Sequence, residues 1–386
     1  MIVRNILHKG VLLLLAAMAL NSCDMMTEDL SDCPTGLYVN FVYDYNIQRA
    51  DMFKDHVGGL TLYVFDESDR LVAERTVSGS ELTGYGYNIH FSEQELAPDH
   101  LYRLQAVAMQ KDWNEALSQS GAKYRKTDLQ KGDYRSDLVI TLDHQHATPY
   151  DLVPNTAPLD TLWHTLTTLE AKGAALPAAT RYHLASNGQP STNGVEEIMV
   201  LRGEPTYATV SLIRDTNHLN LSLREIDNPE NVYDEDYEVF IVDANTTVDC
   251  FNEVVAPSDS VVYRPYAQWT TYFEGTEGIA AERSAHYDLM FNRLIYNGER
   301  VNDNALLCIR KVATGEVIAM LNLPYILCQG RMAYEIYSYQ PQEYLDREYD
   351  YRLELFLKNG RWAQGSFISV CIDVLSWAKR IQYVEF

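Results

Sequence analysis

The chain has 386 residues and a formal net charge of −23 at neutral pH. A chain this acidic repels the phosphates of nucleic acids, so we exclude nucleic-acid binding. Its apolar content of 46% is enough for packed cores, and its length allows two domains of ordinary size.

The first 22 residues have the features of a secretion signal. Two basic residues precede ten apolar ones, Val11–Leu20, which is half the length of a membrane-spanning helix. The next residues, Leu20-Asn21-Ser22-Cys23, resemble the lipobox of bacterial lipoproteins. We therefore expect cleavage between Ser22 and Cys23 and lipid attachment to the Cys23 thiol. The alternative is an ordinary signal peptide that ends beside a chance cysteine.

Cleavage would leave 364 residues (386 minus 22), and the loss of Arg4 and Lys9 would change the net charge from −23 to −25. No other segment approaches eighteen apolar residues, so we expect a water-soluble body on a lipidated tether, residues 23–35. Acidic residues within this tether resemble a surface-export signal of Bacteroidetes lipoproteins, although a solvated linker would look the same. We predict a lipid-anchored protein of the outer membrane, with surface exposure favoured.

Alternation with a period of two predicts strands along most of the chain. In the first half, the predicted strands are 36–45, 60–66, 71–77, 85–91, 101–109 and 138–142. The stretch from Pro149 to Pro205 contains clusters of Gly, Pro, Ala and Ser, so we predict long loops near a domain boundary. In the second half, the predicted strands are 207–212, 219–223, 237–243, 260–266, 306–311, 317–323 and 349–357.

The chain end is also predicted to be extended. Asn359-Gly360 is typical of a tight hairpin turn, and the last segment, 367–386, alternates and is predicted as a final strand. Helix is expected only as short turns at 323–327 and 341–347. These elements predict an all-β protein with two β-sandwich domains, residues 36–195 and 196–386.

Apart from Cys23, the chain contains an odd number of cysteines without a CxxC pair or regular spacing. We predict that most are buried as small apolar residues rather than paired. These are Cys33, Cys250, Cys308, Cys328 and Cys371.

The sequence contains none of the common catalytic motifs, so we predict neither enzyme activity nor a cofactor. His144 and His146 alternate beside Asp143 and are the best metal ligands available, but a solvated pair at a strand end is the more common arrangement. The acidic residues within 227–236 offer oxygens to calcium without the spacing of a calcium loop, so a charged surface loop is preferred. We predict no bound metal.

Tryptophans can bind sugars by stacking when they are exposed on a surface. In β-sandwiches they more often lie in the core or at its ends. The four tryptophans considered for such a platform are Trp163, Trp269, Trp362 and Trp377.

Several short motifs occur in a fixed order behind the lipobox. They are Cys33-Pro34-Thr35-Gly36, Tyr43-Asp44-Tyr45-Asn46, Ala50-Asp51-Met52-Phe53, Leu60–Asp66, Val239–Asn245, Gln342–Glu348 and Ile372–Trp377. In this order they resemble the FimB/Mfa2 family, the lipoprotein anchor and minor subunits of Bacteroidetes fimbriae. One departure is Asn245-Thr246, which stands where the family has Asn-Gly.

The resemblance implies two transthyretin-like β-sandwich domains and a non-enzymatic role, in which the protein holds the base of a fimbria in the outer membrane and limits its length. It also implies fimbrillin stalk subunits as partners, joined by β-augmentation. A tip adhesin of the same family and a surface glycan-binding lipoprotein are the alternatives.

We expect the last strand to contact the polymer, although it could instead be only the last core strand. The residues proposed for this contact are Phe367, Val370, Ile372, Val374, Trp377, Ile381 and Phe386. Stalk relatives lose their first strand by cleavage after an arginine. Arg49 follows the first predicted strand here, and an anchor should resist that cut.

Overall fold

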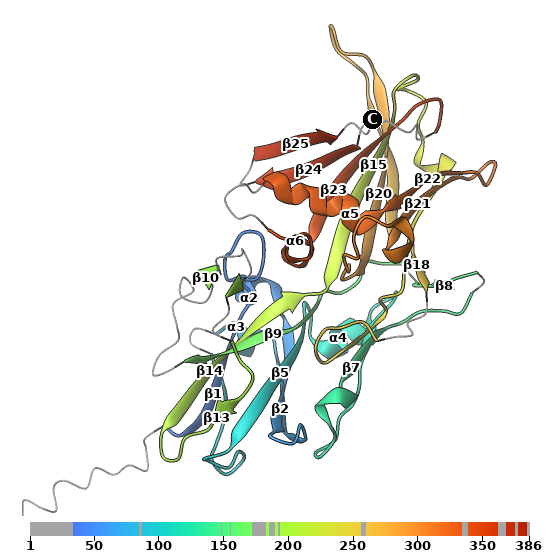
Figure 1. The fold of residues 1–386 in the computed structure, drawn as a ribbon. Coiled ribbons are helices and arrows are strands. Elements are labelled where there is room, and N and C mark those ends of the chain that lie inside the picture. The colour runs from blue at the N-terminus through green and yellow to red at the C-terminus, as the bar shows by residue number, and fades with distance from the viewer. Residues whose placement is uncertain are drawn as a thin grey trace, which may run out of the picture.

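The computed structural model describes residues 34–84, 87–147, 149–154, 156–171, 183–184, 190–191, 194–255, 260–333, 339–361, 368–374 and 377–383. Strands dominate these residues, and helices are short, so the prediction of an all-β protein is confirmed. Figure 1 shows two lobes, with the blue and green N-terminal strands in the lower one and the orange and red C-terminal strands in the upper one.

The lower lobe is built on a nine-stranded sheet. Its main path has the order β3-β2-β5-β9-β14-β1-β4, with β12 and β13 paired to β9 and β5. The strands are β1 (Gly36–Val42), β2 (Gly59–Asp66), β3 (Leu71–Ser78), β4 (Ile89–Phe91), β5 (Leu101–Met109), β9 (Leu162–Ala171), β12 (Gly194–Val195), β13 (Ile198–Met199) and β14 (Pro205–Arg214). Short helices accompany it, namely α2 (Phe53–His56), α3 (Ser80–Thr83) and α4 (Trp113–Ser118).

Two smaller sheets complete this part of the chain. One has the order β17-β7-β6, with β6 (Tyr124–Lys126), β7 (Val139–Leu142) and β17 (Thr247–Asp249). The other is the pair β10 (His183–Leu184) and β11 (Pro190–Ser191). Because β17 comes from the second half of the sequence, the three-stranded sheet ties the two halves together.

The upper lobe is a sandwich of two sheets. The six-stranded sheet has the order β19-β20-β15-β23-β24-β25, and the five-stranded sheet has the order β22-β21-β16-β18-β8. The first contains β15 (Thr216–Glu225), β19 (Ala267–Phe273), β20 (Glu282–Asn292), β23 (Asp350–Leu357), β24 (Ile368–Val374) and β25 (Trp377–Tyr383). The second contains β8 (Asp151–Leu152), β16 (Tyr237–Asp243), β18 (Val261–Tyr263), β21 (Leu306–Lys311) and β22 (Val317–Asn322).

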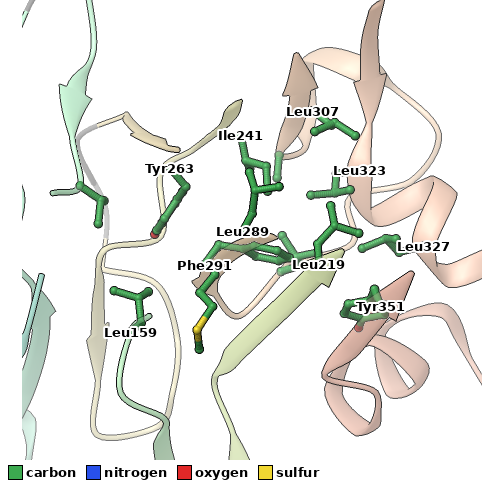
Figure 2. Packing of buried hydrophobic residues seen from close by; sticks show 14 of the residues in the cluster. Leu159, Leu219, Ile241, Tyr263, Leu289, Phe291, Leu307, Leu323, Leu327 and Tyr351 are labelled. Atoms are coloured by element: carbon green, nitrogen blue, oxygen red, sulfur yellow. The ribbon is translucent and has the colours of Figure 1, made fainter. Parts of the chain in front are cut away.

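Buried side chains from both sheets meet between them. Figure 2 shows Leu219 and Leu289 of the six-stranded sheet close to Ile241 and Leu307 of the five-stranded sheet. Two helices, α5 (Leu323–Leu327) and α6 (Pro341–Arg347), add further apolar contacts. The same cluster includes buried residues from the first half of the chain, so the core is continuous across the two lobes.

One residue joins the two large sheets. β14 ends at Arg214 in the lower sheet and β15 begins at Thr216 in the upper one, so only Asp215 separates them. In Figure 1 the yellow-green strand passes from one lobe into the other at this point. Asp215 is buried, and its carboxylate binds His164 Nδ1 and accepts a hydrogen bond of 2.5 Å from Asn252 Nδ2.

Two predicted segments were wrong, and two strands of the six-stranded sheet, β19 and β20, were not predicted. The region 149–205 was predicted as loops, yet it contains β9, a central strand of the lower sheet. A bulge explains the error, because Ser211 pairs with Thr167 and Leu212 with Thr165, which leaves Leu166 unpaired and breaks the alternation. The final segment forms two antiparallel strands, β24 and β25, rather than one.

The predicted hairpin turn at Asn359-Gly360 is confirmed, since both residues have positive φ angles of 52° and 64°. The predicted boundary at residues 195/196 stays a prediction. Strands that follow it in sequence, β13 and β14, nevertheless pair with β5, β9 and β1 of the lower sheet.

We expect Asp215→Ala to lower the free energy of unfolding by about 2–4 kcal/mol, because His164 and Asn252 would lose their buried partner. Urea unfolding of the purified chain measures this loss. The control is Arg202→Ala, which breaks an exposed ion pair of 2.8 Å with Asp99 and should cost less than about 1 kcal/mol. Equal losses for the two variants would show that the junction does not depend on Asp215.

Candidate functional site

The six-stranded sheet has two edge strands, and they differ in how they are covered. β25 forms one edge, and in the part of the chain that the structure describes its strand partner is β24. β19 forms the other edge and pairs with β20. In Figure 1, the red strands β24 and β25 lie on one side of the upper lobe, and the gold hairpin of β19 and β20 projects at its top. An edge strand presents unpaired backbone groups, so each edge is a place where another strand could add.

The predicted polymer contact lies on the β24–β25 hairpin. Val370, Ile372 and Val374 fall on β24, while Trp377 and Ile381 fall on β25. Phe367 and Phe386 lie outside the described residues. The backbone register joins the two strands along their whole length, from Ile368 opposite Tyr383 to Val374 opposite Trp377. Within the described ranges, the outer backbone groups of β25 are therefore the part of this hairpin that has no strand partner.

The acidic stretch 227–236 lies against the opposite edge. The backbone N–H of Asp234 donates to Oγ1 of Thr270 on β19 over 2.9 Å, and the Thr270 hydroxyl donates to the Asp234 carboxylate over 2.6 Å. The Tyr272 hydroxyl donates to Glu230 over 3.1 Å. These contacts attach the acidic stretch to β19, which agrees with the preferred prediction of a charged loop.

Trp269 of β19 is the tryptophan that best fits a platform for ligands. It is 38% exposed, and its ring stacks on His286 of β20 at 5.2 Å between centroids and 16° between planes. Both imidazole nitrogens lie 2.8 Å from hydroxyl groups, Nδ1 from Ser222 and Nε2 from Thr271. Burial, with a smaller effect of Arg224, lowers the pKa of His286. The imidazole that stacks on the Trp269 ring is therefore neutral at pH 7.

Trp163, another tryptophan considered for a platform, does not contribute to this surface. Trp163 is fully buried in the core of the lower lobe. Trp362 lies outside the described residues, and only the backbone of Trp377 is described.

His144 and His146 share a carboxylate partner, but it is not Asp143, the predicted one. Asp143 forms an ion pair with Arg125 at 2.6 Å. His144 and His146 instead approach Asp151, at 3.7 Å and 2.9 Å. Among the residues that the structure describes, no group of three or more His, Cys, Asp or Glu side chains is arranged to hold a metal ion.

Three of the five other cysteines are free buried thiols, namely Cys250, Cys308 and Cys328. Burial raises the pKa of each to about 11, so all three are neutral thiols with low reactivity at pH 7. Cys33 and the side chain of Cys371 lie outside the description.

Arg49 lies in a tight turn beyond β1. It has a positive φ of 54°, and its Nε donates to the Tyr339 hydroxyl over 3.1 Å. β1 itself lies between β14 and β4, parallel to the first and antiparallel to the second. A cut after Arg49 would therefore release a strand that is hydrogen-bonded on both sides.

The fold is that of an all-β protein with two lobes and a polar outer sheet face. A profile of the fimbrillin-A associated anchor proteins Mfa1 and Mfa2 matches residues 30–383. The chain belongs to this family, so it is a fimbria-associated protein of the cell surface. The predicted family resemblance is confirmed.

Solved structures share the fold along nearly the whole chain. A candidate adhesin from Bacteroides thetaiotaomicron is 23% identical with a TM-score of 0.65, covering 92% of this chain and 100% of the other. A candidate polysaccharide-binding protein of the same organism is 22% identical with a TM-score of 0.64, covering 90% and 99%. The fimbrial anchor protein Mfa2 from Porphyromonas gingivalis is 16% identical with a TM-score of 0.52, covering 90% and 99%.

A search of curated proteins found no match. None of the helices in the described ranges is both long and apolar enough to cross a membrane.

Proposed function

We propose that this chain is a non-enzymatic lipoprotein that anchors the base of a fimbria, or a minor fimbrial subunit, in the outer membrane. The match to the anchor family over residues 30–383 is the observation that carries the proposal. The sequence Leu20-Asn21-Ser22-Cys23 supports it, because lipid on Cys23 would supply the membrane attachment that an anchor needs.

We propose further that stalk subunits join the chain by β-augmentation at β25. This strand is an edge of the six-stranded sheet and lies close to the chain end. Added strands gain backbone hydrogen bonds along the whole edge, while alternate side chains provide specificity. A sheet edge of seven residues gives room for such a partner.

Cys23→Ala should abolish lipid attachment while leaving the folded body unchanged. We expect fimbriae to be shed into the medium, because the fibre would lose its membrane attachment. Electron microscopy of cells, together with immunoblots of the medium, measures this. Cys33→Ala is the matched control and should retain fimbriae on cells. Fimbriae that stay attached to Cys23→Ala cells would contradict the anchor function.

Deleting residues 381–386 shortens β25 and removes the chain end. We expect the lipidated protein to remain on the cell but to stop co-purifying with fimbrillin subunits, since the edge strand would be lost. Deleting residues 384–386 alone leaves β25 complete and is the control. Fimbriae that remain anchored after the longer deletion would rule out β25 as the contact.

The mass of the surface protein tests cleavage after Arg49. Intact surface protein of full mature mass would show that Arg49 is not cleaved.

Glycan binding is the second candidate function, and the exposed Trp269 favours it. Its indole lies on the polar face of the sheet, where Asn220 donates to Asp288 over 2.6 Å and Arg224 pairs with Glu354 at 3.0 Å. An aromatic ring beside fixed polar groups is suited to a sugar, whose ring faces are apolar and whose edges carry hydroxyls.

Trp269→Ala should weaken binding of the purified chain to a glycan array roughly tenfold if this face binds sugar. Tyr272→Ala is the control, because Tyr272 lies on the other face of β19 and is similarly exposed, at 46%. An array without any bound glycan, or equal loss in both variants, would contradict glycan binding here.

A further inference from the structure

Two exposed aromatic side chains lie on the same face of the edge strand β19, in the gold hairpin at the top of Figure 1. They are Trp269, 38% exposed, and Phe273, 42% exposed. Their cross-strand partners, His286 and Glu282, alternate with the core residues of β20, so both rings lie on the outer face of the six-stranded sheet. At a rise of about 3.3 Å per residue, their Cα atoms are about 13 Å apart.

The surface between the two rings is polar and has small side chains. Thr271 lies midway on the same face, and its hydroxyl is 2.8 Å from Nε2 of His286. Its cross-strand partner is Ser284, a small side chain that is buried. No bulky side chain of β19 or β20 therefore stands between Trp269 and Phe273. We call Trp269, Thr271 and Phe273 the aromatic row.

An extended glycan fits the aromatic row better than a single sugar or a protein strand. Sugar rings have apolar faces that stack on aromatic rings, and hydroxyls at their edges that can bond to the Thr271 hydroxyl. A single sugar would cover one of the two aromatic rings. A protein strand added to β19 would bind the backbone groups at the sheet edge rather than the faces of the rings.

A carboxylate lies beside the outer end of the row. Glu282 is opposite Phe273, and its side chain is 38% exposed. Its cationic partner is Arg224, at 3.4 Å. Arg224 lies closer to Glu354, at 3.0 Å, so it neutralises the charge of Glu282 in part.

Further acidic residues surround the aromatic row. Asp288 lies on the same face of β20, two residues from the partner of Trp269. Glu274 and Glu277 at the tip of the hairpin are exposed. A group of carboxylates attracts ammonium groups and repels the carboxylates of uronic acids. Charge complementarity therefore favours a glycan with free amino groups over an acidic one.

We propose that the aromatic row binds a linear glycan with free amino groups. Two of its sugar rings stack on Trp269 and Phe273, and an ammonium group lies beside Glu282. This inference rests on glycan binding, the second candidate function, to which it adds two subsites and a class of sugar. A second copy of this chain is disfavoured as the ligand, because two strongly acidic surfaces would meet.

Calorimetry of the full lipidated protein in phosphatidylcholine nanodiscs tests this with defined oligosaccharides, at mildly acidic pH where amino groups are charged. We expect the hexamer of glucosamine to bind best. The hexamer of N-acetylglucosamine should bind roughly threefold or more weakly, because it lacks ammonium groups. Glucosamine itself should bind roughly tenfold or more weakly than its hexamer, since it covers one ring. Hexagalacturonate should not bind, and hexalysine controls for positive charge alone.

Trp269→Ala and Phe273→Ala should each weaken binding of both glucosamine hexamers roughly tenfold, because one stacking surface is lost. Tyr272→Ala is the control, since Tyr272 is similarly exposed, at 46%, and lies on the other face of β19. Its affinities for both hexamers should equal those of the unchanged protein.

Glu282→Gln separates charge from stacking. It should weaken binding of the glucosamine hexamer roughly threefold and leave binding of the acetylated hexamer unchanged, because the partly exposed ion pair is lost. Glu316→Gln is the matched control. The Glu316 side chain is also 38% exposed, and it pairs with an arginine, Arg361, at 2.8 Å. This variant should keep the preference for the amino glycan.

The outcomes distinguish this inference from glycan binding itself. If none of the glycans binds, both are wrong. If a hexamer binds but Phe273→Ala leaves its affinity unchanged, or if the two hexamers bind equally well, glycan binding stands and this inference is overturned. Equally tight binding of glucosamine and its hexamer would exclude the second subsite. Equally tight binding of hexalysine would indicate a basic peptide as the ligand and would also overturn the inference.

Discussion

The whole structure depends on a single buried residue between two sheets. Asp215 separates β14 from β15, and each of these strands is internal to its own sheet. The two sheets therefore cannot move apart without breaking hydrogen bonds within both of them. The carboxylate of Asp215 also binds His164 from the lower lobe and Asn252 from the segment after β17. Because buried polar groups need hydrogen-bond partners, these contacts stabilise the observed arrangement of the lobes.

The same junction gives the chain a continuous path of paired strands. β1 follows the N-terminal tether and pairs with β14 in parallel, and β14 continues into β15. β15 pairs in parallel with β23, which is joined through β24 to β25. In the proposed anchor, tension would enter at the tether and leave at β25. When two parallel strands are pulled from opposite ends, the force acts along the strands. The hydrogen bonds between the two strands then share the load.

Local patterns predicted many strands, but not how they meet. Alternation identified β15 and β23, because one face of each lies in a core and their pairing is regular. β20 has the same signal in Ala285, Tyr287, Leu289 and Phe291, so it could have been predicted. β9 could not, since its bulge interrupts the alternation. Contacts such as Asp215 with Asn252, or Arg264 with Glu238, depend on pairing between distant segments, which no local pattern contains.

The two outer faces of the upper lobe have opposite chemistry. On the six-stranded sheet, polar side chains such as Ser222, His286 and Asp288 are bonded to one another, so the face is satisfied without a partner. On the five-stranded sheet, Phe240 and Met320 meet water, which has a free-energy cost that a partner would remove. A fimbrial protein that pairs strands at an edge still has both faces available. The five-stranded sheet leaves the Met320 side chain 49% exposed, and the six-stranded sheet leaves the Trp269 side chain 38% exposed, so each outer face has an apolar site that a partner could cover.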